Sequence, residues 1–83
     1  MEKPVADIIG LIDMVGEDTS VPKNIRRALS EAKERLKGQD ELSTRVSAAI
    51  YAIEGISEDI NMPMHARTQI WAILSALESI KTK

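Results

Sequence analysis

The chain has 83 residues, a net charge of −2 and no cysteine, which excludes disulfides, thiolate metal sites and thiol catalysis. It contains one tryptophan, one tyrosine and no phenylalanine, so a single chain cannot assemble an aromatic platform on which nucleobases stack. The amino terminus MEKPVADIIG lacks a secretory signal pattern, and no segment approaches the roughly 18 continuous apolar residues of a membrane span. We therefore expect a cytoplasmic protein with no membrane partner.

Apolar residues recur every three or four positions along most of the chain, and this spacing predicts four amphipathic helices. Pro4 suits the first turn of the first helix, which should stop at Gly16. Pro22 and Pro63 should lie in the first turns of the second and fourth helices, and Gly38 should end the second helix in a left-handed conformation. The four apolar stripes run from Val5 to Val15, from Ile25 to Leu36, from Leu42 to Ile56 and from Ala66 to Ile80.

The second half of the chain repeats the residue pattern of the first half without a gap. The simplest explanation is two copies of one helical hairpin, over about 4–37 and about 41–81, each with an apolar face that it cannot bury alone. Packing the two hairpins face to face gives one all-α domain over 1–83, an up-and-down four-helix bundle. The residues that recur unchanged 41 positions later include Ile9, Ile12, Glu17, Asp18, Pro22, Arg26 and Leu36.

The segment VPKNIR follows an acidic pair at the start of the second predicted helix. Together with the four-helix pattern, it resembles a family of short, uncharacterised archaeal proteins whose signature runs close to V-P-[RK]-N-I-R. The resemblance covers essentially the whole chain and implies an all-α up-and-down bundle, but it implies no activity because the family has none assigned. The residues that carry the match are Val21, Pro22, Lys23, Asn24, Ile25 and Arg26.

The two repeated loops should lie at the same end of such a bundle, where they would form a polar surface. One reading is a ligand site, with carboxylates for a hard cation or arginines and helix N-termini for an anion. The other reading is a structural staple, in which the acidic residues cap helices and the arginines bridge back to them. The residues of this polar end are Glu17, Asp18, Lys23, Arg26, Glu58, Asp59 and Arg67.

The second predicted helix is basic and offers an alternative surface for RNA or a ribosome. Glu31 and Glu34 interrupt the positive charge, and acidic helices alongside would cancel much of its field. A solvated face that pairs with its neighbours is the competing interpretation. The basic residues are Lys23, Arg26, Arg27, Lys33, Arg35 and Lys37.

Catalytic and metal-binding patterns are weak in this sequence. His65 is the only histidine, its neighbours Asn61 and Gln69 at helical spacing are poor metal ligands, and we expect it to be exposed in the first turn of the fourth helix. With one histidine and no cysteine, no set of nucleophile, base and orienting group can be drawn. We therefore expect no enzyme activity, no cofactor, no catalytic residue and no metal site.

The first and fourth helices carry more apolar surface than one core needs. Methionine and tryptophan left at a surface are typical of an interface, although a small bundle also buries a wide arc of each helix. The sequence therefore favours a small intracellular scaffold or interaction module that binds a protein partner or self-associates as a homodimer. RNA or ribosome association through the basic helix is the alternative. The candidate apolar contact residues are Leu11, Met14, Met64 and Trp71.

Overall fold

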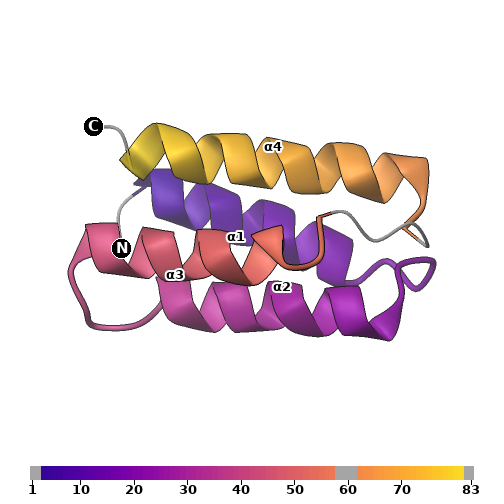
Figure 1. Cartoon of the computed structure of the whole chain (residues 1–83), viewed down its shortest axis with the longest axis horizontal. Coiled ribbons are helices and arrows are strands. Elements are labelled where there is room, and N and C mark those ends of the chain that lie inside the picture. The colour runs from indigo at the N-terminus through magenta and orange to yellow at the C-terminus, as the bar shows by residue number, and fades with distance from the viewer. Residues whose placement is uncertain (1–2, 58–61, 82–83) are drawn as a thin grey trace.

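Four α-helices dominate the computed structural model, which describes residues 3–57 and 62–81. Figure 1 shows that successive helices run in opposite directions, so that the connection between α1 and α2 lies at the same end as the start of α4. The expected all-α fold of four packed helices is confirmed. The helices are α1 (Lys3–Gly16), α2 (Lys23–Leu36), α3 (Leu42–Glu54) and α4 (Met64–Lys81).

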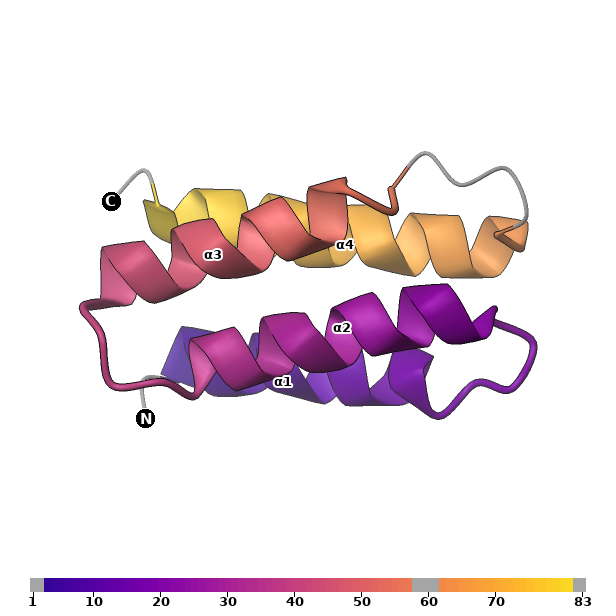
Figure 2. The same ribbon diagram turned by 60° about the horizontal axis from the view of Figure 1, so that its bottom comes forward.

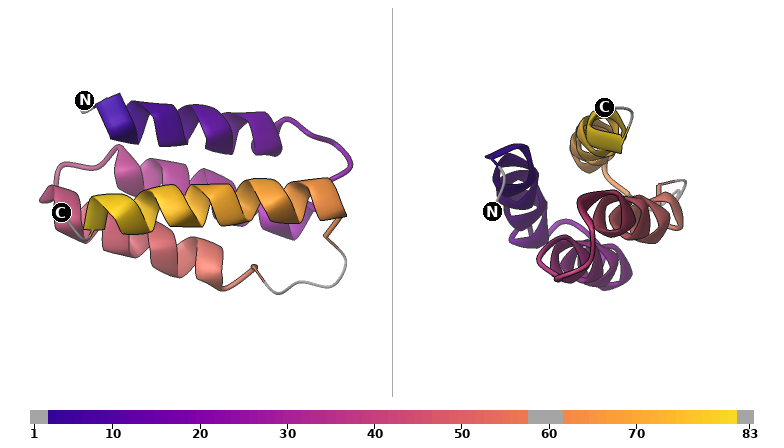
Figure 3. Two further views of the ribbon diagram at one scale, coloured as in Figure 1. Left: turned by 90° about the horizontal axis from the view of Figure 1, so that it is seen from above. Right: turned by 90° about the vertical axis from the view of Figure 1, so that its left-hand side faces the viewer.

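The helices pack in a closed ring in which each one contacts two neighbours. The most extensive contact joins α2 to α3, and further contacts join α3 to α4, α1 to α2 and α1 to α4. Figure 2 shows the α1–α2 pair and the α3–α4 pair as two layers, and the end-on view in Figure 3 places the four helices around one centre. No helix among the described residues is long and apolar enough to cross a membrane.

The centre of the ring is filled by the apolar stripes that the helical spacing predicted. Within the described ranges the buried residues are all hydrophobic, and the half-buried Gln69 on α4 has one buried oxygen, Oε1, without a hydrogen-bond partner. Burial of these side chains is the main favourable term in folding. The core residues are Val5, Ile8, Ile12, Val15, Val21, Ile25, Leu29, Ala32, Leu36, Val46, Ala49, Ile50, Ile53, Met62, Ala66, Ile70, Ile73 and Leu77.

Pro22 and Pro63 lie directly before their helices and not in the first helical turns, where the sequence placed them. Pro22 is the N-cap of α2, with φ −58° and ψ 150°, rather than a member of its first turn. Its carbonyl oxygen accepts the N–H groups of Ile25 and Arg26, both at 3.1 Å. Pro63 likewise precedes α4 and accepts the Arg67 N–H at 3.0 Å. The extended ψ is compatible with the proline ring, and neither position requires a backbone N–H.

The end of α2 also differs from the expectation, because none of the described glycines has a positive φ. The helix ends instead through an αR residue, Lys37, and a side chain from α3 caps one of its last carbonyl groups, that of Leu36. Arg45 donates from Nη1 to the Leu36 carbonyl and from Nε to the Asp40 carbonyl, both at 2.9 Å. The first hydrogen bond supplies a donor to the last carbonyl of α2, so no left-handed Gly38 is needed there, and the second holds the loop that follows.

Truncation of the core tests the assignment of buried positions. We expect Leu29→Ala to lower the free energy of unfolding by about 2–5 kcal/mol, because Leu29 is fully buried and its removal leaves a cavity. The control Tyr51→Ala, on the exposed side of α3, should lower it by less than about 1 kcal/mol. Urea denaturation measures both values, and equal losses would contradict the burial assigned to Leu29.

Candidate functional site

The connection between α1 and α2 meets the first turn of α4 through a cluster of three polar side chains. His65 Nε2 lies 2.8 Å from Asp18 Oδ2. Asp18 Oδ1 accepts two further hydrogen bonds, from the Ser20 hydroxyl at 2.6 Å and from the Ser20 N–H at 2.9 Å. Ser20 Oγ is 3.3 Å from the same histidine nitrogen. The cluster therefore links two segments 47 positions apart in the sequence.

The hydrogen bonds hold Asp18 in its ionised form. The Ser20 hydroxyl contributes most, followed by the Ser20 N–H and then His65, and together they lower the pKa of Asp18 from 3.8 to about 2. The Asp18 and His65 side chains stay partly open to solvent, at 30% and 56% exposure. Water therefore screens the contact between them, and its contribution to stability is small compared with that of the core.

Arg26 belongs to the predicted polar end but contacts its own loop rather than an acidic residue. Its Nε donates to the Val21 carbonyl at 3.1 Å, and the side chain is half-buried. Arg26 and Glu17 also line a polar cavity of about 220 Å³ between α1 and α2. The arginine therefore stabilises the turn that leads into α2 through a hydrogen bond to a backbone carbonyl.

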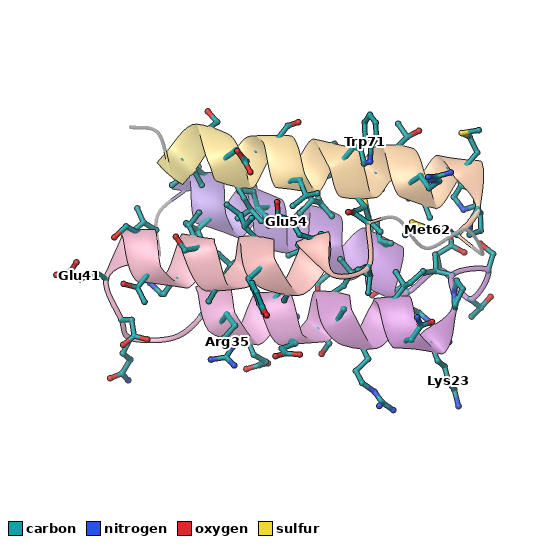
Figure 4. All side chains as sticks on the ribbon, viewed as in Figure 1. Lys23, Arg35, Glu41, Glu54, Met62 and Trp71 are labelled. Atoms are coloured by element: carbon teal, nitrogen blue, oxygen red, sulfur yellow. The ribbon has the colours of Figure 1, made fainter. Side chains whose placement is uncertain are left out.

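The other predicted polar-end residues do not converge on one point. Lys23 is exposed and projects away from the four helices (Figure 4). Arg67 lies on α4 beside Met64 and Trp71, in a groove described below. Glu58 and Asp59 lie outside the described residues. Among the residues that are described, no group of three carboxylates or histidines is arranged to hold a metal ion.

Two contacts made by charged side chains, an ion pair and a hydrogen bond to the backbone, have no local signature in the sequence. Lys33 Nζ and Asp13 Oδ1 form an ion pair of 2.8 Å between α2 and α1. The hydrogen bond to Asp13 raises the pKa of Lys33. The other contact is that of Arg45 with the end of α2, described above. Neither contact could be read from the chain, since each depends on which helices become neighbours.

The apolar residues singled out in the sequence do lie at the surface. Met14, Met64 and Trp71 are 59%, 77% and 65% exposed, and Leu11 is 37% exposed. Tyr51 on α3 is also exposed, although the sequence analysis did not select it. Its place outside the apolar stripe of α3 is the signal that could have identified it.

Two grooves run along the solvent side of α4 and share Trp71 as a common wall. One, of about 360 Å³, is lined by Met64, Arg67, Thr68 and Trp71. The other, of about 410 Å³, is lined by Trp71, Leu74, Ser75 and Glu78. Figure 4 shows Trp71 on α4, on the opposite side of the molecule from Lys23. We call the seven lining residues the α4 outer face: Met64, Arg67, Thr68, Trp71, Leu74, Ser75 and Glu78.

A comparison with known families accounts for most of the chain. Residues 1–80 match the model of an uncharacterised protein family, UPF0147. The chain belongs to this family. The UPF0147 protein of Archaeoglobus fulgidus is 42% identical over 82 residues, which are 99% of this chain and 94% of the relative. That of Pyrococcus furiosus is 47% identical over 83 residues, covering 98% and 89%. The resemblance to a short archaeal family is confirmed.

Two solved structures have the same fold as this chain. The crystal structure of a protein of unknown function, MMP1188, gives a TM-score of 0.90 at 47% identity and covers 94% of this chain and 90% of that one. A UPF0147 protein from Thermoplasma acidophilum gives a TM-score of 0.87 at 28% identity, covering 93% and 92%. The compact packing of four helices is therefore shared with these relatives.

The Asp18–Ser20–His65 cluster of this UPF0147 protein has the residue types of a hydrolase triad but not its geometry. In a triad the carboxylate and the serine approach opposite nitrogens of the histidine, whereas here both approach Nε2. The Ser20 hydroxyl donates its hydrogen to Asp18, so no base activates it as a nucleophile. The arrangement can cross-link the loop to α4. It differs from the predicted staple, because no side chain caps the start of α2 and Arg26 donates to a backbone carbonyl and not to an acid.

The acid dependence of stability tests the Asp18 cluster. The pKa of Asp18 is depressed in the folded protein, so its stabilisation is present above the unfolded value of 3.8 and is lost as the pH falls towards about 2. We expect Asp18→Asn to melt below the wild type at about pH 5, and the gap to close at about pH 2. Thermal melts followed by circular dichroism measure this gap.

The exposed Asp7 provides a charge-matched control, because Asp7→Asn removes one negative charge elsewhere on the molecule. If Asp18→Asn and the wild type melt at the same temperature at about pH 5, the cluster contributes nothing to stability, and the stabilising role assigned to Asp18 is wrong.

Proposed function

We propose that this protein is a small intracellular scaffold that works by protein contact, and that it self-associates through apolar side chains on α1 and α4. The observation that carries the proposal is the exposure of Met14, Met64 and Trp71, at 59%, 77% and 65%. In the isolated chain these three large side chains contribute little hydrophobic stabilisation, because they remain in contact with water. The apolar stripes of the four helices, by contrast, are buried.

The residue types on these two helices support contact with another protein. Tryptophan, methionine and arginine are enriched in interface cores, and Met64, Arg67 and Trp71 share one groove. Leu11 lines a further groove of about 610 Å³ between α1 and α4. An 83-residue domain also has a small core, which gives the isolated chain limited stability. Burial of a second apolar surface by association would add to that stability.

The RNA alternative is less well supported, because three of the five basic side chains on α2 already have partners within the molecule. Arg26 donates to the Val21 carbonyl. Lys33 pairs with Asp13 at 2.8 Å, and Glu31 lies 3.7 Å from Arg35. A surface that binds the phosphate backbone normally presents cations with unopposed positive charge. RNA binding is therefore retained as an outcome of the test below.

We also propose that the fold arose from two copies of one hairpin, α1–α2 and α3–α4. The burial pattern supports this: eight of the nine core positions from Val5 to Leu36 have a core counterpart 41 positions later. The exception is Val15, whose counterpart Ile56 is half-buried. Pro22 and Pro63, also 41 apart, both directly precede a helix and accept an N–H from the arginine four residues later.

Superposition of one hairpin on the other checks the duplication in the two solved relatives. Two copies should share crossing angle and loop position, because both were inherited from one unit. Hairpins with clearly different crossing angles would contradict the proposal.

The solution mass tests self-association. We expect light scattering to give twice the chain mass at low salt (about 0.1 M) and at high salt (about 1 M), because apolar contact does not weaken with ionic strength as charge contact does. The absorbance ratio of the same sample should show no nucleic acid.

Two results would contradict this proposal in different ways. A monomer at both salt concentrations would exclude self-association. A monomer that carries RNA at low salt and loses it at high salt would favour the basic helix α2 as the binding surface.

A further inference from the structure

The α4 outer face carries opposite charges at its two ends and apolar side chains between them. Arg67 lines one groove and Glu78 the other, and Trp71 is common to both. Leu74 follows Trp71 in the second groove. The inference below rests on the proposed function, since it names the partner and the geometry of the self-association.

Helical geometry places these side chains in a line. Arg67 and Glu78 are eleven residues apart, which is close to three turns of an α-helix and about 16 Å along its axis. They therefore lie on the same side of α4. Trp71 follows Arg67 by four residues, and Leu74 precedes Glu78 by four residues. The order along the helix is therefore basic, aromatic, aliphatic and acidic.

This order is complementary to itself when it is reversed. If a second α4 lies antiparallel to the first, with a two-fold axis between positions 72 and 73, Arg67 faces Glu78 of the second copy and Glu78 faces its Arg67. The same axis places Trp71 against Leu74 of the second copy, twice. An isologous contact of this kind brings one patch onto itself, and the pairing closes at two chains.

We propose that the occupant of the α4 outer face is a second copy of this chain, bound with its α4 antiparallel. Trp71 would fill the groove beside Leu74 of the second copy, and the two Arg67–Glu78 pairs would form the polar rim around it. Thr68 and Ser75, the small polar residues of the face, allow the two helices to approach. An apolar centre with charged ends that match in register is what a two-fold contact requires.

A charge exchange tests the register. Arg67→Glu places two acids opposite each other at both rim pairs of its homodimer, and Glu78→Arg places two bases there. Each variant alone should dimerise about tenfold more weakly than the wild type. In an equal mixture of the two variants, every rim pair again joins opposite charges, so a mixed dimer should form in preference to either homodimer. Sedimentation equilibrium and native mass spectrometry measure these populations.

Matched controls separate the register from a general effect of charge. Arg27→Glu and Glu34→Arg make the same changes on the exposed side of α2 and should leave the dimer unchanged. Trp71→Ala should abolish the dimer, because it removes the central side chain. Melting curves of every variant verify that the exposed substitutions leave the monomer folded.

The outcomes distinguish the geometry from the proposed function. Single variants that weaken the dimer but are not rescued by mixing would overturn the antiparallel register. A dimer that resists all α4 variants but is broken by Leu11→Glu or Met14→Glu would overturn the α4 contact and leave self-association intact. A wild-type chain that is monomeric at all concentrations would overturn both.

Discussion

The apolar stripe on each helix is the constraint on which the rest of the structure depends. None of the four helices can bury its stripe alone, and the closed ring of contacts between neighbouring helices brings all of them to one centre. Within the described residues the fully buried side chains of this centre are all apolar, so its stability rests on burial and close packing. The polar contacts at the surface act on a fold that the core already specifies.

The end of the molecule that carries the α1–α2 connection shows how such surface contacts refine the fold. Asp18 and His65 join this connection to α4, and Ser20 fixes the carboxylate that makes the contact. At the opposite end, Arg45 closes α2 by donating to the Leu36 carbonyl. Both devices satisfy or position groups near helix ends, where the backbone lacks partners of its own. Both contacts join parts of the chain that belong to different helices or loops.

The solvent side of α4 has a different character. Its tryptophan and methionine are open to water, and two grooves meet at Trp71. A small domain with an apolar core and an apolar outer face is well suited to association, because the second burial adds to a limited first one. Self-pairing of α4 would explain in one step why its exposed residues are apolar at the centre and oppositely charged at the two ends.

The sequence by itself determined the four helices and their buried faces, and it placed Pro22 and Pro63 within one residue of where α2 and α4 begin, because the spacing of apolar residues and the geometry of proline are local properties. It also identified the exposed Met14, Met64 and Trp71, which fall outside the stripes. Only the tertiary structure decided that Asp18 meets His65, that Lys33 meets Asp13 and that Arg45 caps α2. These partners are distant along the chain, and their contacts depend on which helices become neighbours and on the direction of each side chain.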